Sequence, residues 1–188
     1  MKHRLFSVLR MTLVLPLAAC ATDFSRPSPD GLTPQAVALA DAVKLGCMPF
    51  ALGEKSEAAA MNDGGLRRQI RIPSYPAPPF LNRQYKSDGP GEPLVTIYGP
   101  GCTVRARGSD VAAFNLALDR VYVQRFGRDY AGRAPPAQPT DDQFPGMKRF
   151  CAAGHIFQSY PDPPDSIGRH GFNVMISPEP PSYCTDLP

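Results

Sequence analysis

Two segments of the chain repeat hydrophobic residues at the spacing of an α-helix. Residues 34–46 have apolar side chains every three or four positions, after Thr33, a typical capping residue. Residues 111–126 show the same spacing more strongly and follow Asp110, another capping residue. We therefore predict two main helices over these ranges, and a shorter third helix over residues 56–62.

Alternating apolar and polar residues predict strands elsewhere in the chain. The clearest hairpin joins residues 94–98 to residues 102–107 across a Gly-Pro-Gly turn. Further strands are expected at residues 69–72, 147–153, 155–160 and 172–176. Strands mixed with two helices indicate an α+β fold, with both helices packed on one face of an antiparallel sheet. The 23 prolines exclude long helices throughout and predict proline-rich loops.

The first twenty residues follow a different pattern. Three basic residues, Lys2, Arg4 and Arg10, precede an uncharged apolar stretch over residues 11–19. This stretch is too short to cross a bilayer of about 30 Å as a helix. It ends in Leu-Ala-Ala-Cys at residues 17–20, which resembles the lipobox of bacterial lipoproteins.

The resemblance implies a lipid anchor and a position in the cell envelope. Residues 1–19 would be a signal peptide, Cys20 would carry the lipid, and residues 20–32 would be a tether for a domain spanning residues 33–188. Ala21 is typical of lipoproteins sorted to the outer membrane, facing the periplasm. The alternative is an ordinary secretory signal cut at the same place, with an unmodified cysteine.

Four cysteines remain after Cys20, and an even number in an exported chain predicts disulfides. Three pairings are open, of which we favour Cys47 with Cys102 and Cys151 with Cys184. No pair of cysteines has the short spacing of a zinc site, so we expect no metal ion.

The charge of the chain depends on the signal peptide. The whole sequence has a formal net charge of +3. The segment before Cys20 contains three basic residues and no acid, so the remainder has 17 basic and 17 acidic side chains. A neutral domain has no general attraction for nucleic acid, and we expect no nucleic-acid partner.

Arginines on the predicted strands are the main binding candidates. Arg105 and Arg107 alternate along one strand, so both lie on the same sheet face, and Arg67, Arg68 and Arg71 cluster earlier in the chain. If these arginines gather on one sheet face, they could bind an anionic ligand or an acidic partner. The alternative is a solvated face with cross-strand ion pairs, each contributing roughly 0–1 kcal/mol.

No catalytic residue or cofactor is predicted. His155 and His170 lie near serines and aspartates, but no nucleophile-elbow sequence surrounds them. The leading hypothesis is a non-enzymatic binding or envelope protein, attached to the membrane by its lipid and meeting a protein partner there. The alternatives are an inhibitor or immunity-type lipoprotein that binds a secreted enzyme, and a small periplasmic hydrolase.

Overall fold

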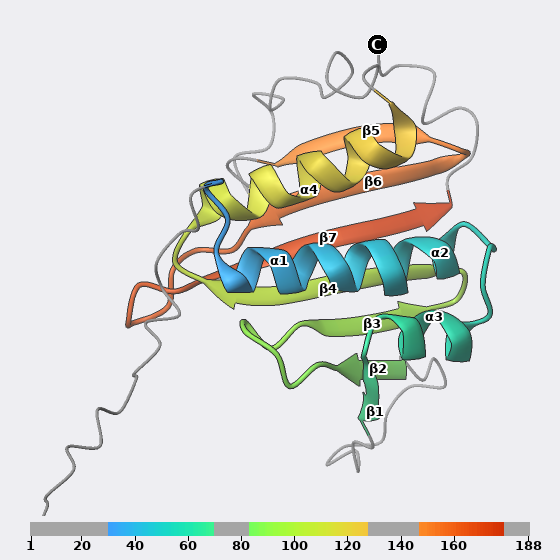
Figure 1. The fold of residues 1–188 in the computed structure, drawn as a ribbon, viewed down its shortest axis with the longest axis horizontal. Coiled ribbons are helices and arrows are strands. Elements are labelled where there is room, and N and C mark those ends of the chain that lie inside the picture. The colour runs from blue at the N-terminus through green and yellow to red at the C-terminus, as the bar shows by residue number, and fades with distance from the viewer. Residues whose placement is uncertain (1–29, 70–82, 128–146, 179–188) are drawn as a thin grey trace, which may run out of the picture.

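The structure is a computed structural model that describes residues 30–69, 83–127 and 147–178. Its centre is an antiparallel sheet with the strand order β1-β2-β3-β4-β7-β6-β5 (Figure 1). The strands are β1 (Arg67–Gln69), β2 (Arg83–Lys86), β3 (Leu94–Tyr98), β4 (Gly101–Gly108), β5 (Lys148–Ala152), β6 (His155–Pro161) and β7 (His170–Pro178). Strands from both halves of the chain meet at the central pair, β4 and β7.

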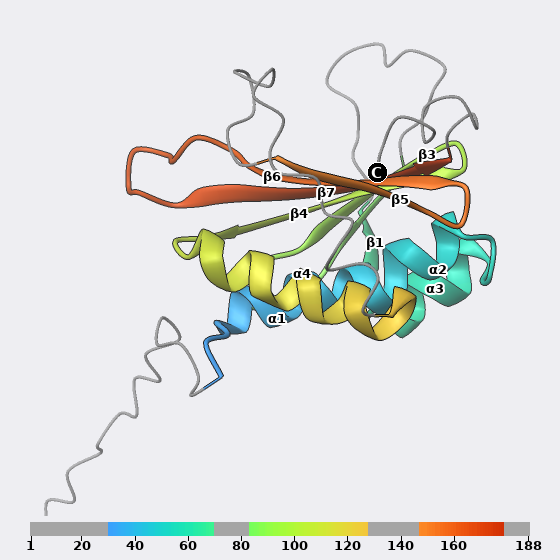
Figure 2. The same cartoon turned by 90° about the horizontal axis from the view of Figure 1, so that it is seen from above.

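The helices lie on one face of this sheet (Figure 2). They are α1 (Pro34–Asp41), η1 (Ala42–Cys47), α2 (Met48–Ala51), α3 (Glu57–Asp63) and α4 (Val111–Phe126). The α+β prediction, with two main helices on one face of an antiparallel sheet, is confirmed. In the described ranges, no helix has the length and hydropathy needed to cross a membrane.

The first helix is longer than predicted. Its expected end at Gly46 is wrong, because α1 continues through the π-helical segment η1 into α2, as far as Ala51. The N–H of Met48 bonds to the carbonyl of Val43, five residues earlier. Where a helix changes from this five-residue spacing back to the four-residue spacing of an α-helix, one backbone carbonyl has no N–H partner. Proline has no backbone N–H, so Pro49 disrupts the hydrogen bonding of the helix little at this point.

The second main helix has the predicted bounds. The Asp110 carboxylate accepts a hydrogen bond of 2.9 Å from the N–H of Ala113 at its start. At its end Gly127 has a φ of 81°, a conformation that favours glycine. The short third helix is also confirmed, with Ser56 as its N-cap.

The predicted strands agree with the structure except near the β1 edge. The hairpin of β3 and β4 is confirmed, and β5 and β6 are joined by Ala153 and Gly154, which both have positive φ. The strand predicted at residues 69–72 is displaced, because β1 ends at Gln69 and residues 70–82 lie outside the described ranges. No prediction covered β2, whose sequence Arg-Gln-Tyr-Lys lacks β-branched residues and takes its conformation from pairing on both sides.

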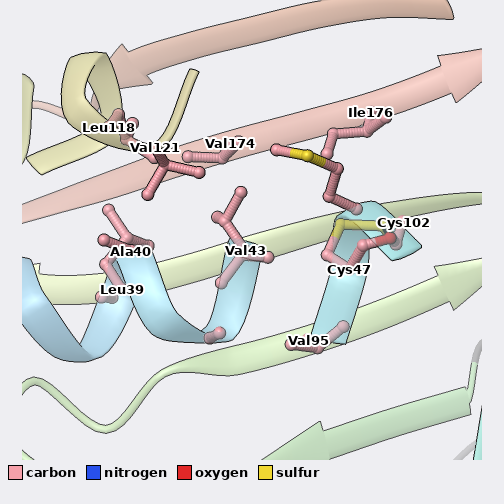
Figure 3. Close-up of a cluster of buried hydrophobic side chains, with 14 of the residues drawn as sticks. Leu39, Ala40, Val43, Cys47, Val95, Cys102, Leu118, Val121, Val174 and Ile176 are labelled. Atoms are coloured by element: carbon pink, nitrogen blue, oxygen red, sulfur yellow. Dashed lines mark hydrogen bonds between the residues drawn. A yellow bond between two sulfur atoms is a disulfide. The ribbon is translucent and has the colours of Figure 1, made fainter. Parts of the chain in front are cut away.

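The core lies between the helices and the sheet. Leu39 and Val43 face β-strand residues such as Val174 across this layer, all of them fully buried (Figure 3). Towards the β5 edge the core is aromatic, since the rings of Phe150 and Phe157 stack with centroids 4.7 Å apart and Tyr122 packs edge-on against both. The apolar positions at helical spacing lie on this side of both main helices: Leu39, Val43, Phe114 and Leu118 are buried, while Val111 and Phe126 at the two ends of α4 are partly buried.

Candidate anion-binding site

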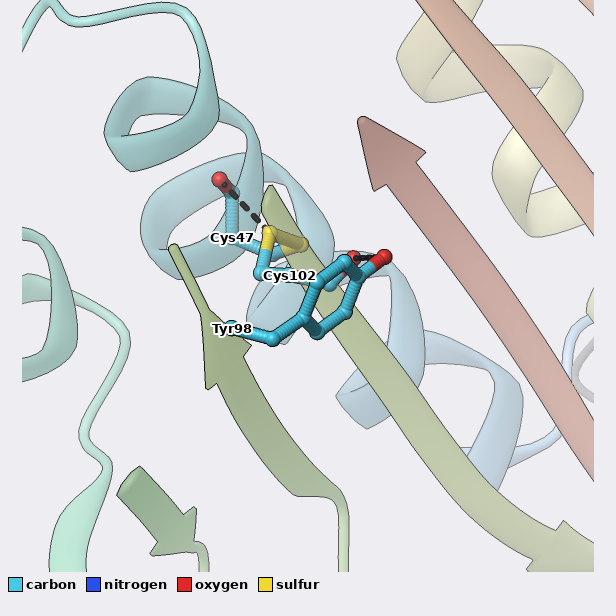
Figure 4. The surroundings of a disulfide bond; sticks show 3 residues. All are labelled: Cys47, Tyr98 and Cys102. Atoms are coloured by element: carbon cyan, nitrogen blue, oxygen red, sulfur yellow. Dashed lines mark hydrogen bonds between the residues drawn. A yellow bond between two sulfur atoms is a disulfide. The ribbon is translucent and has the colours of Figure 1, made fainter. Parts of the chain in front are cut away.

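One disulfide joins the first helix to the sheet. Cys47 and Cys102 are bonded, as predicted, and the hydroxyl of Tyr98 donates a 3.4 Å hydrogen bond to the carbonyl of Cys102 (Figure 4). Both sulfur-bearing residues are fully buried. The bridge therefore fixes the end of η1 onto the start of β4.

The described residues include one half of a second disulfide. Cys151 is disulfide-bonded, and its partner lies outside the described residues because Cys47 and Cys102 bond to each other. Cys184 and Cys20 both fall outside those ranges, so the predicted pairing of Cys151 with Cys184 and the lipid on Cys20 stay predictions.

A polar cavity of about 330 Å³ lies on the sheet face away from the helices. It is lined by Gln69, Gln84, Lys86, Gly91, Glu92, Leu94, Arg105 and Arg107. Arg105 and Arg107, the pair predicted from the sequence, thus line the same cavity as Lys86 of β2. Three basic side chains and one carboxylate give the described lining a formal excess of positive charge, whereas residues 20–188 as a whole have equal numbers of basic and acidic side chains.

The alternation of β4 places the two arginines in this cavity. Val104 and Ala106 point into the core and are buried, so Arg105 and Arg107 point to the opposite face and are exposed. Pairing with β7 sets Arg105 opposite Asn173. The cavity therefore lies over β1 to β4, and pairing of β4 with a strand on each side holds the backbones of the two arginines in place.

Arg105 is oriented by a network that starts on β7. Its guanidinium is 2.6 Å from the Asp162 carboxylate, whose other oxygen accepts a 2.8 Å hydrogen bond from the Asn173 amide. Gly171 leaves room for this ion pair, because a Cβ there would collide with the Asp162 carboxylate and lie 3.1 Å from the Arg105 guanidinium. Burial raises the pKa of the neighbouring Tyr160 hydroxyl, and the Asp162 charge raises it further, although Arg105 lowers it.

Arg107 has a different environment. Its backbone N–H donates a 3.0 Å hydrogen bond to the carbonyl of Gly91, which fixes the β2–β3 loop against β4. Within the described part of the chain, no carboxylate pairs with its guanidinium. Arg107 is therefore the cation in this cavity that is available to a ligand.

The third cation already has a partner. The Lys86 ammonium is 3.0 Å from the carboxylate of Glu92, on the β2–β3 loop, and that Glu92 side chain is 64% exposed. Exposed ion pairs of this kind contribute little, roughly 0–1 kcal/mol. An incoming anion can therefore replace Glu92 on Lys86 at small cost.

The earlier arginine cluster does not gather at this cavity. Arg67 pairs with Asp88 at 3.5 Å, while Arg68 lies on the other face of β1, close enough to Glu57 to lower its pKa. Arg71 lies outside the described ranges. The condition that these arginines gather on one sheet face with Arg105 is therefore not met at Arg68, because neighbouring residues in a strand point to opposite faces.

Both histidines bond to backbone carbonyls. His155 Nδ1 is 2.8 Å from the carbonyl oxygen of Ala153, and His170 Nδ1 is 3.0 Å from that of Asp162. The Asp162 carboxylate is occupied by Arg105 and is not bonded to the imidazole. No group of ligands suited to a metal ion occurs among the residues described.

The residues that complete the cavity were not predicted from the sequence. Lys86 and Gln84 belong to the unpredicted strand β2, and Asp162 precedes a turn-rich stretch that gave no sign of contact with β4. The alternation of Gln84 and Lys86 was the one signal available. Scans of protein-family models, curated proteins and solved structures found no match to this chain.

Proposed function

We propose that this protein is a lipid-anchored binding protein of the bacterial cell envelope, and that it binds an anionic group at the cavity formed by Arg105, Arg107 and Lys86. The anchor would be Cys20, at an outer membrane facing the periplasm. The observation that carries the proposal is Arg107, a cation without a carboxylate partner among the described residues, in a cavity with two further cations.

The disulfides support export. Disulfides form and persist in oxidising compartments and are rare in the cytosol. The chain has a buried bridge between Cys47 and Cys102, and Cys151 is oxidised as well. This agrees with the signal and lipobox pattern that ends at Cys20, which is an independent sequence feature.

The geometry of the cavity supports binding of an anion. Arg105 is held in position by Asp162, so its guanidinium loses little conformational freedom when a ligand binds. Two side-chain amides, Gln69 and Gln84, add neutral donors to the same wall. Guanidinium groups bind carboxylates and phosphates through paired hydrogen bonds, so ligands with either group fit this lining.

The anchor is tested by the intact mass of the protein purified from bacterial membranes. We expect a chain that begins at Cys20 and carries added acyl mass. Cys20→Ser should abolish incorporation of labelled palmitate, while Thr22→Ser in the same tether should leave it unchanged. An unmodified amino terminus would contradict the proposed anchor.

Binding is tested by calorimetric titration of the purified protein with inorganic phosphate and with citrate at low salt. We expect Arg107→Gln to weaken binding about threefold to fivefold, the range for an exposed charge pair. Arg149→Gln, on the edge strand β5, is the matched control and should leave the affinity unchanged. Equal affinity of the wild type and Arg107→Gln would contradict the site.

A further inference from the structure

A second cavity lies beside the anion-binding cavity. It has a volume of about 460 Å³ and lies at the start of α1, lined by apolar residues: Leu32, Pro34, Val37, Ala38 and Pro90. Val37 is 41% exposed, so a large part of its apolar side chain is open to a ligand in this cavity. We call this cavity the apolar hollow.

The two cavities share the β2–β3 loop as a wall. Pro90 lines the apolar hollow, and the next residue, Gly91, lines the anion-binding cavity. Gly91 accepts a 3.0 Å hydrogen bond from the backbone N–H of Arg107, and a Cβ at Gly91 would lie 3.1 Å from Gln35 of α1. The β2–β3 loop therefore packs against both α1 and β4. The apolar hollow lies on one side of this loop, and the anion-binding cavity with its basic side chains lies on the other.

We propose that this end of the molecule binds an anionic membrane lipid, with an acyl chain in the apolar hollow and the phosphate of its headgroup at Arg107. This inference rests on the proposed function, because it uses the same anion-binding cavity and the anchor at Cys20. It specifies an anionic lipid as the ligand, and it assigns the apolar hollow as the site of the acyl chain, which a simple anion does not have.

Charge favours this orientation of the lipid. Among the described residues that line the apolar hollow, Asp41 alone is ionisable, and its charge repels a phosphate there. The excess positive charge lies across the loop, at Arg107 and its neighbours. An amphiphile with an anionic head and an apolar tail matches both linings, whereas an acidic peptide matches one of them.

The length of the tether brings the hollow to the membrane. Leu32 follows Cys20 by twelve residues, which span at most about 40 Å when extended. A lipid on Cys20 therefore keeps Leu32 and the start of α1 within that distance of the bilayer surface. Lipids of this leaflet are then the amphiphiles present at the highest local concentration.

The test is native mass spectrometry of the full protein, released from dodecyl maltoside with equal amounts of dioleoyl phosphatidylglycerol and dioleoyl phosphatidylcholine. We expect more phosphatidylglycerol adduct than phosphatidylcholine adduct. Val37→Asn should lower the phosphatidylglycerol adduct at least threefold. Arg107→Gln should remove the preference for phosphatidylglycerol.

Two matched variants separate this effect from general loss of charge or apolar surface. Leu45→Asn changes a side chain that is 37% exposed on η1, and Arg149→Gln changes a basic residue on β5. Neither residue lines the two cavities, and both variants should behave as the wild type. Thermal unfolding should show Val37→Asn to be folded, because the side chain is already partly in water.

The outcomes distinguish the two proposals. If Arg107→Gln weakens binding of inorganic phosphate but Val37→Asn leaves the lipid adducts unchanged, the anion-binding site stands and the lipid inference is wrong. If phosphate binding does not depend on Arg107, both are wrong. Equal adducts of the two lipids, or dimers in place of adducts, would also overturn the lipid inference.

Discussion

The two faces of the sheet have opposite chemistry although they alternate along the same strands. On β4, Val104 and Ala106 are buried under the helices, while Arg105 and Arg107 between and after them are exposed. On β4, one face is thus buried in the core and the other contributes two arginines to the cavity, although nearer the β5 edge Ile156 is buried on the second face as well. Substitutions one residue apart on a strand should therefore affect different properties, namely stability on the buried face and anion binding on the other.

The largest effect on stability is expected from the disulfide on the helix-covered face. Replacing both Cys47 and Cys102 by alanine removes a cross-link over 55 residues, which should lower the free energy of unfolding by about 4 kcal/mol. Chemical denaturation of the oxidised protein and of the double variant measures the difference. A change below about 1 kcal/mol would show that the bridge does not restrict the unfolded chain.

On β7, the neighbouring residues Ile176 and Ser177 should differ most clearly in how much they contribute to stability. Ile176 is fully buried, so Ile176→Ala should cost about 3 kcal/mol, whereas Ser177→Ala on the other face should cost less than about 0.5 kcal/mol. Urea denaturation of both variants provides the test. Similar costs would mean that the second face is packed as tightly as the first.

The next effect concerns the orientation of Arg105. Gly171→Ala places a methyl group against the Asp162 carboxylate, which has to move together with its ion pair. We expect a loss of about 1 kcal/mol in stability and a measurably weaker phosphate affinity. Gly154→Ala, where a Cβ meets no atom within 4 Å, controls for the removal of a glycine, although its positive φ adds some strain. An unchanged phosphate affinity in Gly171→Ala would show that Asp162 does not position Arg105 for binding.

The smallest effect is a pH dependence at the β1 edge, on the helix side. Burial alone would raise the pKa of Glu57, but hydrogen bonds from Arg83 and Tyr85 and the Arg83 charge hold it below its usual value. Because the folded pKa is lowered, this stabilisation is present above the ordinary carboxyl pKa of about 4.3 and is lost as pH falls through the folded pKa.

Glu57→Gln isolates that contribution. The wild type should be more stable than the variant by about 0.5 kcal/mol at pH 7, since the cluster is partly exposed, and the gap should shrink towards pH 3. Thermal unfolding across this pH range measures it. A gap that widens on acidification would reverse the assigned sign.

Local patterns predicted most of the fold because they report which side of an element is buried. The stripe on residues 111–126 and the alternation in β3 and β4 were sufficient for their elements. Two features depend on tertiary contacts and left little local signal: β2, which is a strand because of its two neighbours, and the helix that continues past Pro49 through a π turn.

The candidate site was predictable only in part, because some of its residues are brought together by tertiary contacts. Arg105 and Arg107 share a face because of the period of a strand, which the sequence displays. Their neighbours Lys86 and Asp162 are brought in by strand pairing and by the turn before β7, over separations of 19 and 57 residues from Arg105. Hydrophobic patterning carries no information on such polar contacts.

The most direct measurement is a phosphate titration followed by NMR of the arginine Nε–Hε groups. We expect the signals of Arg107 and Arg105 to shift with a common midpoint, while those of Arg149 and Arg125, outside the cavity, stay in place. Shifts of equal size at all four arginines, or none at Arg107, would contradict an anion-binding site on the helix-free face.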